Sequence, residues 1–426
     1  MYRVLSELVE INPRTDLPAG ARTSMKVSFI PMSDVTESGD WIGSSERTLD
    51  TVRNGFTAFA DGDILVAKIT PCFENGKGAH VTGLTNGVGF GSTEFHVLRA
   101  RNGVSQRFIH HVTQSENLRR MAEASMSGSA GQRRVPSDFF ERYLVPDLSF
   151  EEQVIFGKIL DTLDTTIRQA EAIIEKLKHV RQGLLHDLLT RGIDANGELR
   201  PPQNQAPHLY KHSLLGLIPN DWRAGKIEEF VARIIDYRGK TPAKCSSGVP
   251  LITAKNVRLG YVDPEPREFI SEGTYAQWMT RGFPQRGDVL FTMEAPLGNV
   301  AQIENGDRLA FAQRTIILQT NSGTSSSFLK FLLLGESFRR RLFRMGSGST
   351  VEGIQQSTFR RLAIAVPSSI TEQLEIVRVL DESDITIYRE TATLTKLRKT
   401  KTGLADDLLS GRIHIKALLN SVDVLL

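Results

Sequence analysis

The chain has 426 residues, of which 40% are hydrophobic, and a formal net charge of +3. This length exceeds one ordinary core and predicts two or three domains. No apolar run approaches the roughly 20 residues of a membrane-spanning helix, and the N-terminus lacks the basic-then-apolar pattern of a secretory signal. Cys72 and Cys245 have no CxxC partner, which argues against a disulfide framework or a zinc site. We therefore expect a cytoplasmic protein that does not contact a membrane.

The charge is distributed unevenly. Residues 1–150 hold 16 basic and 17 acidic residues (−1), whereas residues 210–365 hold 21 basic and 14 acidic residues (+7). Arginine outnumbers lysine by 13 to 3 in the first segment and by 15 to 6 in the second. The planar guanidinium suits guanine edges and phosphates, so this bias favours a nucleic-acid partner. Solvated surface charge remains the alternative for most individual residues.

Short runs bounded by Gly, Asp and Pro predict strands in the first 150 residues. They read FIPMSDV (29–35), DILVAKI (63–69) and EFHVLRA (94–100). A helical stretch, VSQRFIHHVTQSENLRRMAEAS (104–125), follows them. The interleaving predicts an α+β domain with a mixed, curved sheet.

A long helix is predicted from about residue 153 to residue 190, because apolar residues recur in alternate steps of three and four. These positions are Leu160, Leu163, Ile167, Ala170, Ile174, Leu177, Arg181, Leu184 and Leu188. They form a heptad seam with one basic break, and Gly192 is expected to end the helix. The charged opposite face favours pairing with another helix, although burial of the helix on its own domain is the alternative.

Residues 193–221 are rich in Pro, Asn and Gln and are interpreted as an extended linker. PLITAKNV (250–257), DVLFTM (288–293) and RTIILQT (314–320) then predict strands, and SSFLKFLLLGESFRRRLFRM (326–345) predicts a helix. A second seam follows at Leu380, Ser383, Ile387, Glu390, Leu394, Leu397, Lys401, Leu404 and Leu408, with Gly411 beyond it.

The chain repeats itself over nearly its whole length. DLLTRGI (187–193) returns as DLLSGRI (407–413), and at this offset of 220 residues 152–193 match their counterparts at 16 of 42 positions. SGS at 127–129 returns at 347–349, and GDILVAKITP (62–71) resembles GDVLFTMEAP (287–296). We therefore expect two equivalent α+β domains, each followed by a long helix. A long linker allows the helices to form an antiparallel coiled coil with pseudo-twofold symmetry.

Catalytic motifs fail at the residues that their chemistry needs. Around Gly76-Lys77, Pro71 stands where a P-loop needs its first glycine, and Asn12-Pro13-Arg14 lacks the second proline and the aromatic residue of an amino-methyltransferase motif. The carboxylate and lysine pattern of a metal-dependent nuclease is absent from the second copy. The adjacent His110 and His111 are expected to be a surface pair rather than a metal site. The chain is therefore predicted to be a non-catalytic binding protein.

Two equivalent binding domains held on paired helices suit a DNA target that consists of two separated half-sequences. A helix from residue 153 to residue 190 is roughly 57 Å long at 1.5 Å per residue. That length separates two domains by at least one DNA turn of roughly 34–36 Å. Two other classes stay open: a self-sufficient fused methyltransferase–nuclease, which would bind S-adenosylmethionine by itself, and a structural coiled-coil adaptor without a DNA role.

The order of these motifs resembles the specificity (S) subunits of type I restriction–modification enzymes along nearly the full chain. The resemblance is carried by GFGSTEFHVLRA (89–100), SGSAGQRRVPSDFF (127–140), YLVPDLSFEEQ (143–153) and DLLTRGI, and then by LLGLIPNDWRAGKI (214–227), SGSTVEGIQQSTFRRLAIAVPSSITEQ (347–373) and DLLSGRI. It implies that each variable domain is a target-recognition domain for one half of a bipartite double-stranded DNA sequence, and that the helices set the unread spacer. It implies further that methyltransferase (modification) subunits dock on the chain and use S-adenosylmethionine. A restriction subunit would then translocate and cleave DNA with ATP. The chain itself is expected to hold no cofactor or metal.

The resemblance also divides the chain. Target-recognition domains are expected at residues 1–150 and 210–370, spacer helices at 151–195 and 371–415, a linker at 196–209 and a tail at 416–426.

Candidate DNA-contacting residues lie near the SGS turns and in the arginine clusters, since Arg and Gln suit bidentate contacts to guanine and adenine. In the first domain they are Lys68, Lys77, Arg119, Arg120, Gln132, Arg133 and Arg134. In the second domain they are Lys255, Arg258, Arg314, Arg339, Arg340, Arg344, Gln355 and Gln356. For each of these residues a surface salt bridge is the alternative.

Overall fold

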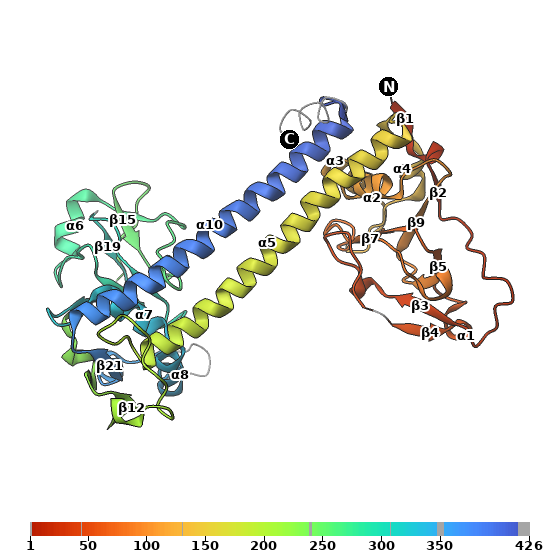
Figure 1. The fold of residues 1–426 in the computed structure, drawn as a ribbon. Helices are drawn as coiled ribbons and strands as arrows, with labels where there is room; N and C mark the ends of the chain where they lie inside the picture. The colour runs from red at the N-terminus through yellow and green to blue at the C-terminus, as the bar shows by residue number, and fades with distance from the viewer. Residues whose placement is uncertain are drawn as a thin grey trace. The chain divides into compact units, whose positions relative to one another are not determined.

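The computed structural model describes residues 2–43, 45–129, 131–237, 241–306, 308–346 and 353–415. It divides into two compact units: unit 1 contains residues 1–172 and 391–426, and unit 2 contains residues 173–390 (Figure 1). The predicted second SGS turn at 347–349 and the predicted tail at 416–426 lie outside the described residues. Within these ranges, every helix is too short or too polar to cross a bilayer.

Unit 1 contains two four-stranded sheets and a small third one. The first sheet is antiparallel, in the order β2 (Val9–Ile11), β9 (Phe95–Ala100), β6 (Ile64–Ala67), β7 (Gly78–His80). The second has the order β4 (Glu46–Thr48), β3 (Lys26–Ile30), β8 (Val88–Gly91), β5 (Thr57–Ala60). In that sheet β3 and β8 run parallel, as expected for a mixed sheet. The third sheet pairs β1 (Tyr2–Val4) with β10 (Leu144–Pro146), and the short helix α1 (Leu49–Val52) follows β4.

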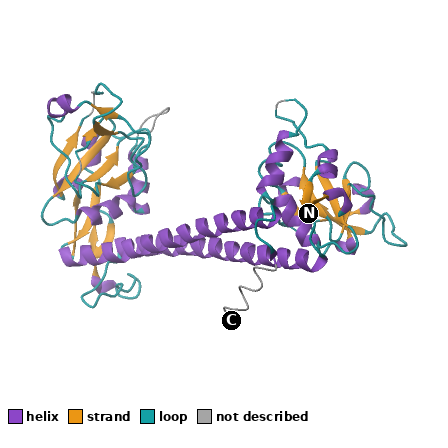
Figure 2. Cartoon of the chain, turned by 90° about the horizontal axis from the view of Figure 1, so that it is seen from above, coloured by secondary structure: helices purple, strands orange, loops and turns teal. Residues whose placement is uncertain are grey.

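Unit 2 repeats this topology. Its antiparallel sheet has the order β14 (Val231–Asp236), β20 (Thr315–Thr320), β17 (Val289–Thr292), β18 (Val300–Gln302). A mixed sheet has the order β16 (Phe269–Ile270), β15 (Val249–Ile252), β19 (Ala310–Phe311), with β15 and β19 parallel. β13 (Trp222–Lys226) pairs with β21 (Ala363–Pro367) as β1 does with β10, and α6 (Glu272–Trp278) follows β16. The antiparallel sheets thus match strand for strand, whereas the described mixed sheet has four strands in unit 1 and three in unit 2. Figure 2 shows helices and strands in both α+β units.

Each predicted helical stretch of the two domains breaks into two helices. The first forms α2 (Gln106–Gln114) and α3 (Glu116–Ala124), and the second forms α7 (Ser326–Leu334) and α8 (Glu336–Met345). Ser115 ends α2 and caps α3, because its extended backbone lets the hydroxyl accept from the Leu118 amide. Gly335 has the same extended backbone between α7 and α8. The shorter α4 (Ser137–Arg142) and α9 (Gln356–Arg360) follow.

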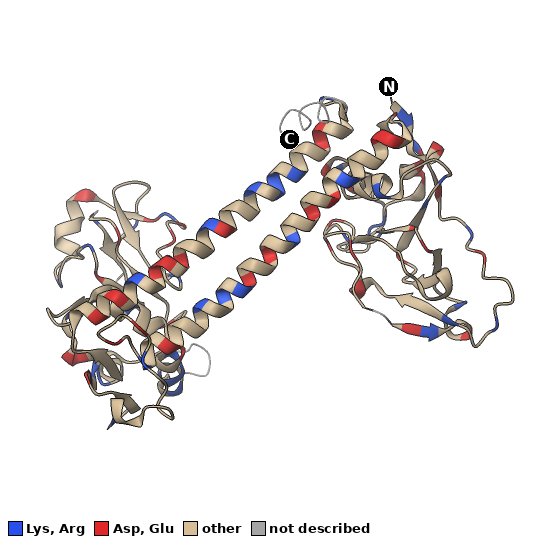
Figure 3. Ribbon diagram, in the orientation of Figure 1, with Lys and Arg blue, Asp and Glu red and all other residues tan. Residues whose placement is uncertain are grey.

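The two long helices are α5 (Phe150–Thr190) and α10 (Ile370–Leu409). Both end as predicted, at glycines in the left-handed region, Gly192 (φ 66°) and Gly411 (φ 67°). Every predicted seam position on the two helices is buried or half-buried. Many residues that flank the seam are exposed, but Asp161, Asp164, Asp381 and Asp384 beside it are half-buried. Figure 3 shows charged residues of both signs along the two helices.

Ion pairs join α5 to α10 at the two basic breaks of the seam. In unit 2, Arg181 on α5 makes a bidentate pair with Asp384 on α10, with Nε–Oδ1 2.7 Å and Nη2–Oδ2 3.0 Å. In unit 1, Lys401 on α10 pairs with Asp164 on α5. Arg181 and Lys401 are 220 residues apart, as are Asp164 and Asp384. From Asp164 to Arg181 the residue number on α5 rises, whereas the number of the partner on α10 falls from 401 to 384. The two helices are therefore antiparallel.

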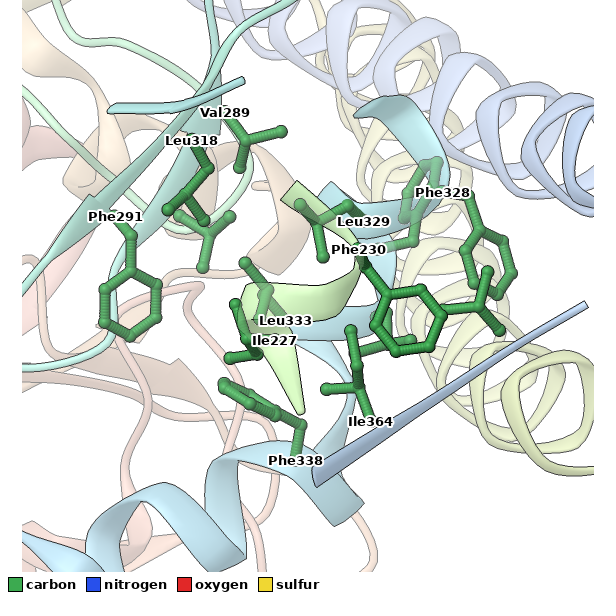
Figure 4. Packing of buried hydrophobic residues seen from close by; sticks show 14 of the residues in the cluster. Ile227, Phe230, Val289, Phe291, Leu318, Phe328, Leu329, Leu333, Phe338 and Ile364 are labelled. Atoms are coloured by element: carbon green, nitrogen blue, oxygen red, sulfur yellow. The ribbon is translucent and has the colours of Figure 1, made fainter. Parts of the chain in front are cut away.

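The main core of each unit includes both long helices. In unit 2 the cluster combines Ile227, Phe230, Phe291, Phe328 and Ile364 of the domain with residues of α5 and α10 (Figure 4). The helix residues of that cluster are Leu185, Leu188, Ile376, Val377 and Leu380. In unit 1 the corresponding helix residues are Phe156, Leu160, Ala405 and Leu408. Each domain therefore packs on the start of its own helix and on the end of the other one.

Several local predictions were wrong. The runs at 29–35 and 250–257 are strands only to Ile30 and Ile252. Residues 193–221 are not an extended linker, because β11 (Tyr210–Ser213) and β12 (Gly216–Pro219) form a hairpin there. Arg200 is also buried, and its guanidinium pairs with Glu372 (Nη1–Oε1 2.5 Å). Glu372 accepts from Trp222 Nε1 (3.0 Å) as well, so this segment is fastened to α10.

Candidate nucleic-acid interface

Three connecting segments meet in unit 1, and we call them the three-loop surface of unit 1. They are the loop after β6 (68–77), the turn before β9 (92–94) and the described residues between α3 and α4 (125–129 and 131–136). The Lys68 amide donates to Glu94 O (2.9 Å), and the Val135 amide donates to Lys68 O (2.9 Å). These main-chain bonds hold the three segments together.

The three-loop surface of unit 2 has the same main-chain pattern. Its segments are the loop after β17 (293–299), the turn before β20 (312–314) and the described residues between α8 and α9 (346 and 353–355). The Met293 amide donates to Arg314 O (2.7 Å), and the Ile354 amide donates to Met293 O (3.0 Å). Each unit thus presents one such surface, built by equivalent elements.

Four predicted residues lie on the three-loop surface of unit 1: Lys68, Gln132, Arg133 and Arg134. Gln132 is exposed and Lys68 is half-buried. Arg134 makes a bidentate pair with Glu94 (Nε–Oε2 3.0 Å and Nη2–Oε1 2.8 Å), and these hydrogen bonds lower the pKa of Glu94. Arg133 lies 3.7 Å from Glu74.

Three predicted residues lie on or next to the three-loop surface of unit 2. There the turn before the strand supplies the basic residue of the ion pair, whereas in unit 1 it supplies the acidic one. Arg314 occupies the position equivalent to Glu94 and pairs with Glu294 (Nε–Oε1 3.1 Å). Arg314 has a positive φ of 79°, which is uncommon for a residue with a side chain. Gln355 is exposed at the start of α9, and Gln356 is half-buried. The two surfaces thus share a backbone pattern but differ in their side chains.

Arg119 and Arg339 were predicted to contact DNA, but the structure engages them inside the fold. The guanidinium of Arg119 donates to the carbonyls of Thr113, Phe73 and Gly76, and burial lowers its pKa to about 10. Arg339 Nη1 donates to Gly298 O (2.6 Å), and burial lowers its pKa as well. Both arginines anchor the loops instead, which removes them from the candidate DNA contacts.

Lys77 is the last residue of the loop after β6, but its Nζ donates to Met32 O (3.0 Å), outside the three segments. The other predicted residues are not brought into the three-loop surfaces by any contact that we identify among the described residues. Arg120 is exposed beside Tyr143 and Asp406. The remaining ones are all exposed: Lys255, Arg258 (3.1 Å from Asp263), Arg340 (2.6 Å from Glu336) and Arg344.

The interpretation of His110 and His111 as a surface pair was wrong, because both side chains are buried. His111 Nε2 lies 2.7 Å from Asp161 Oδ1, and its Nδ1 lies 3.9 Å from Asp164 Oδ2. Within the described ranges, these three residues are the group with the composition and spacing of a metal site. However, Asp161 also pairs with Arg107 and Asp164 with Lys401, so an ion-pair network already occupies both carboxylates.

Sequence reasoning noted Gln153 and Gln373 as matching residues but missed their role. Gln153 is buried, accepts from the Ser105 amide (2.9 Å) and donates to Leu148 O (3.0 Å). Gln373 is buried in the same way, accepting from the Ser325 amide (2.7 Å) and donating to Pro367 O (2.8 Å). Each glutamine ties the first turn of a long helix to the segment that precedes α2 or α7. Two polar residues in matching positions of an amphipathic helix were the available signal.

Comparison with known proteins agrees with this duplicated architecture. Residues 219–399 match the family model described as the type I restriction modification DNA specificity domain. The second half of the chain is thus similar to a domain of type I restriction–modification specificity subunits.

Two relatives illustrate how far the similarity extends. The chain is 35% identical over 195 residues to the specificity subunit of the type I restriction enzyme EcoAI of Escherichia coli, a match that covers 44% of this chain and 32% of that protein. It is 24% identical over 303 residues to the MjaVIII specificity subunit of Methanocaldococcus jannaschii, covering 69% and 68%. The match therefore spans about a third of the Escherichia coli subunit.

Solved structures of type I restriction–modification proteins share the fold. A chain from a study of complex assembly and conformational transition in the type I system has a TM-score of 0.60 at 18% identity, with 96% of both chains covered. The S subunit from M. genitalium has a TM-score of 0.52 at 13% identity, again with 96% of both chains covered. The fold that these chains share with this one has two β-rich domains joined by two long helices in contact.

Proposed function

We propose that this chain is a specificity subunit that reads a bipartite double-stranded DNA target, one half with the three-loop surface of each unit. The recognition domains would comprise residues 1–150 and 210–370. The observation that carries the proposal is the duplication itself: two surfaces with one main-chain pattern and different side chains can bind two different half-sequences in equivalent poses.

The residues proposed to contact DNA are those that lie on these surfaces. They are Lys68, Gln132, Arg133 and Arg134 in unit 1, and Arg314, Gln355 and Gln356 in unit 2. Arg134 and Arg314 are paired with carboxylates in the free chain, which holds the guanidinium groups in defined directions before DNA arrives. Gln132 and Gln355 are exposed and are suited to bidentate contacts with adenine.

We propose further that α5 and α10 set the unread spacer between the half-sites. The residues proposed to form the seam are the apolar positions named above, from Leu160 to Leu188 and from Leu380 to Leu408. A slip of one heptad would place Asp164 opposite Leu394 or Leu408 instead of Lys401. Because an unpaired carboxylate against leucine is costly, the ion pairs favour a single register and thus one spacer length.

The partners follow from the same proposal. Methyltransferase subunits would dock on the chain and bring S-adenosylmethionine, and a restriction subunit would use ATP. The near-neutral charge of residues 1–150 supports a contribution of the methyltransferase subunits to phosphate affinity.

Co-expression of the chain with the methyltransferase gene next to its own tests this function. We expect a complex that methylates adenines at a split target and enriches that target from a random duplex pool. If no complex forms and the purified chain binds no DNA, the proposal is wrong.

A heptad deletion tests the spacer. Removing residues 169–175 and 389–395 together keeps the Asp164–Lys401 and Arg181–Asp384 pairs, removes the exposed Arg398–Glu171 pair, and shortens each helix by about 10 Å. We expect the preferred spacer to shorten by about three base pairs, at 3.4 Å each, with both half-sites unchanged. Removing 169–175 alone is the matched control and should abolish selection, because the two helices then no longer match. A double deletion that keeps its old spacer would contradict the proposal.

A further inference from the structure

Arg119 on α3 and Arg339 on α8 occupy equivalent positions, 220 residues apart, and both reach the same point of the fold. Arg119 Nη2 donates to Gly76 O (2.9 Å), and Arg339 Nη1 donates to Gly298 O (2.6 Å). The two glycines lie just before the equivalent strands β7 and β18, and they have nearly equal left-handed φ angles of 84° and 81°.

The anchor in unit 1 uses the whole guanidinium. Arg119 Nη1 donates to Phe73 O (2.8 Å), its Nε donates to Thr113 O (2.9 Å), and its Cζ lies 5.0 Å from the centre of the Phe73 ring. Two of the three accepting carbonyls belong to the loop after β6, which carries Lys68 on the three-loop surface. Three fixed donors in one plane are available only from arginine.

The anchor in unit 2 uses fewer hydrogen bonds than the anchor in unit 1, but it also binds a carbonyl of the loop before the equivalent strand. Arg339 lies with Cζ 5.2 Å from the centre of the Phe343 ring, and Gly298 belongs to the loop after β17, which carries Glu294. Glu294 is the residue that pairs with Arg314 on the three-loop surface. Movement of this loop would therefore move the candidate reading residues.

We propose that Arg119 and Arg339 are positioning residues for specificity: each holds the reading loop of its own unit in the shape that discriminates one half of the target, without touching DNA. This inference rests on the proposed function. An unanchored loop samples several conformations, so ordering it on the correct half-site costs free energy and the difference between correct and incorrect bases shrinks.

Selection from a random duplex pool, with the full chain and its methyltransferase subunits, tests the proposal. In the Arg119→Lys variant we expect discrimination against single-base changes to fall by about tenfold in one half-site only. The Arg339→Lys variant should show the same loss in the other half-site only. The matched controls are Glu123→Gln on α3 and Ser337→Ala on α8, exposed residues of the same helices, which should leave both half-sites unchanged. Loss in both half-sites from either anchor variant, or no loss in a folded variant, would overturn the proposal.

Hydrogen exchange on the free chain provides a second readout that needs no DNA. Arg119→Lys should speed exchange in residues 70–78 while α2 and α3 keep their protection, and Arg339→Lys should do so around residues 295–300. Unchanged exchange in these loops would overturn the proposal whatever the DNA result. A wild-type complex that selects no bipartite target would instead overturn the proposed function, even where the loops respond as expected.

Discussion

The junctions between domain and helices differ between the two units, although the same carboxylates form them. In unit 1, Asp161 accepts from His111 and Arg107, and Asp164 pairs with Lys401. In unit 2 the equivalent Asp381 lies 3.7 Å from Lys330, and Asp384 pairs with Arg181. The positions of His110 and His111 are taken by Lys330 and Phe331, so only unit 1 has histidines at these two positions.

The chemical consequence is a difference in titration. Burial holds the pKa of His110 well below its ordinary value, and the nearby Arg107, His111, His80 and Lys401 lower it further. Burial also lowers the pKa of His111, while the hydrogen bond that Asp161 accepts from it opposes that shift. Burial alone would raise the pKa of Asp161, but hydrogen bonds from His111 and Arg107 outweigh burial and lower it. The two units thus keep equivalent carboxylates on their long helices. The residues that pair with these carboxylates differ, and so does the expected response of each unit to pH.

Replacing the buried glutamines should give the largest loss of stability. The loss should be equal in the two units, because each unit has the same glutamine anchor. Gln153→Ala leaves the Ser105 amide without its acceptor, and Gln373→Ala does the same to Ser325. Each substitution should lower the free energy of unfolding of its own unit by about 2–3 kcal/mol. Hydrogen exchange measures the stability of each unit separately. The control is Gln169→Ala on the exposed face of α5, which should change the free energy of unfolding by less than about 0.5 kcal/mol. Equal losses in both units from one substitution would contradict local anchoring.

Acidification should destabilise unit 1 more than unit 2. Because folding lowers the pKa of His110 and His111 below 6.5, the unfolded chain binds more protons in this range. Unit 1 is therefore expected to be most stable above pH 6.5 and to lose up to about 1.4 kcal/mol per histidine for each pH unit below it. Exchange rates measured from pH 7.5 to pH 5 should reveal this loss in unit 1 and not in unit 2. His111→Phe, which introduces the residue of unit 2, should reduce it, and an equal loss in both units would argue against the histidines.

The inter-helix ion pairs should give the smallest effect. Lys401→Ala and Arg181→Ala should each cost about 1 kcal/mol, because the pairs are only partly buried. Asp164 has a side-chain exposure of 16% and Asp384 one of 43%, so we expect the larger coupling energy for the Lys401 pair. Double-mutant cycles with Asp164→Ala and Asp384→Ala measure both couplings. The exchanged pair Arg181→Asp with Asp384→Arg should recover most of the loss, and failure to recover would mean that the pair does not help to set the register.

Local patterns were sufficient for the two long helices and for the two central strands of each antiparallel sheet. The heptad steps and the glycines at 192 and 411 predicted both long helices, and the apolar runs predicted β6, β9, β17 and β20. The candidate surface was predicted only in part. Arg134 and Arg314 lie on it, whereas Arg119 could not be told from them, because an arginine that binds carbonyls has the same local sequence as one that faces solvent.

What the sequence by itself determined is the duplication, the class of the long elements and the resemblance to specificity subunits, because periodicity and repeats are properties of neighbouring positions. Only the tertiary structure decided which charged and polar side chains are buried. Arg200 meets Glu372 across 172 positions, and Lys401 meets Asp164 across 237 positions. Whether a polar group is buried depends on such distant partners, since burial is favourable only where the fold supplies a matching donor or acceptor.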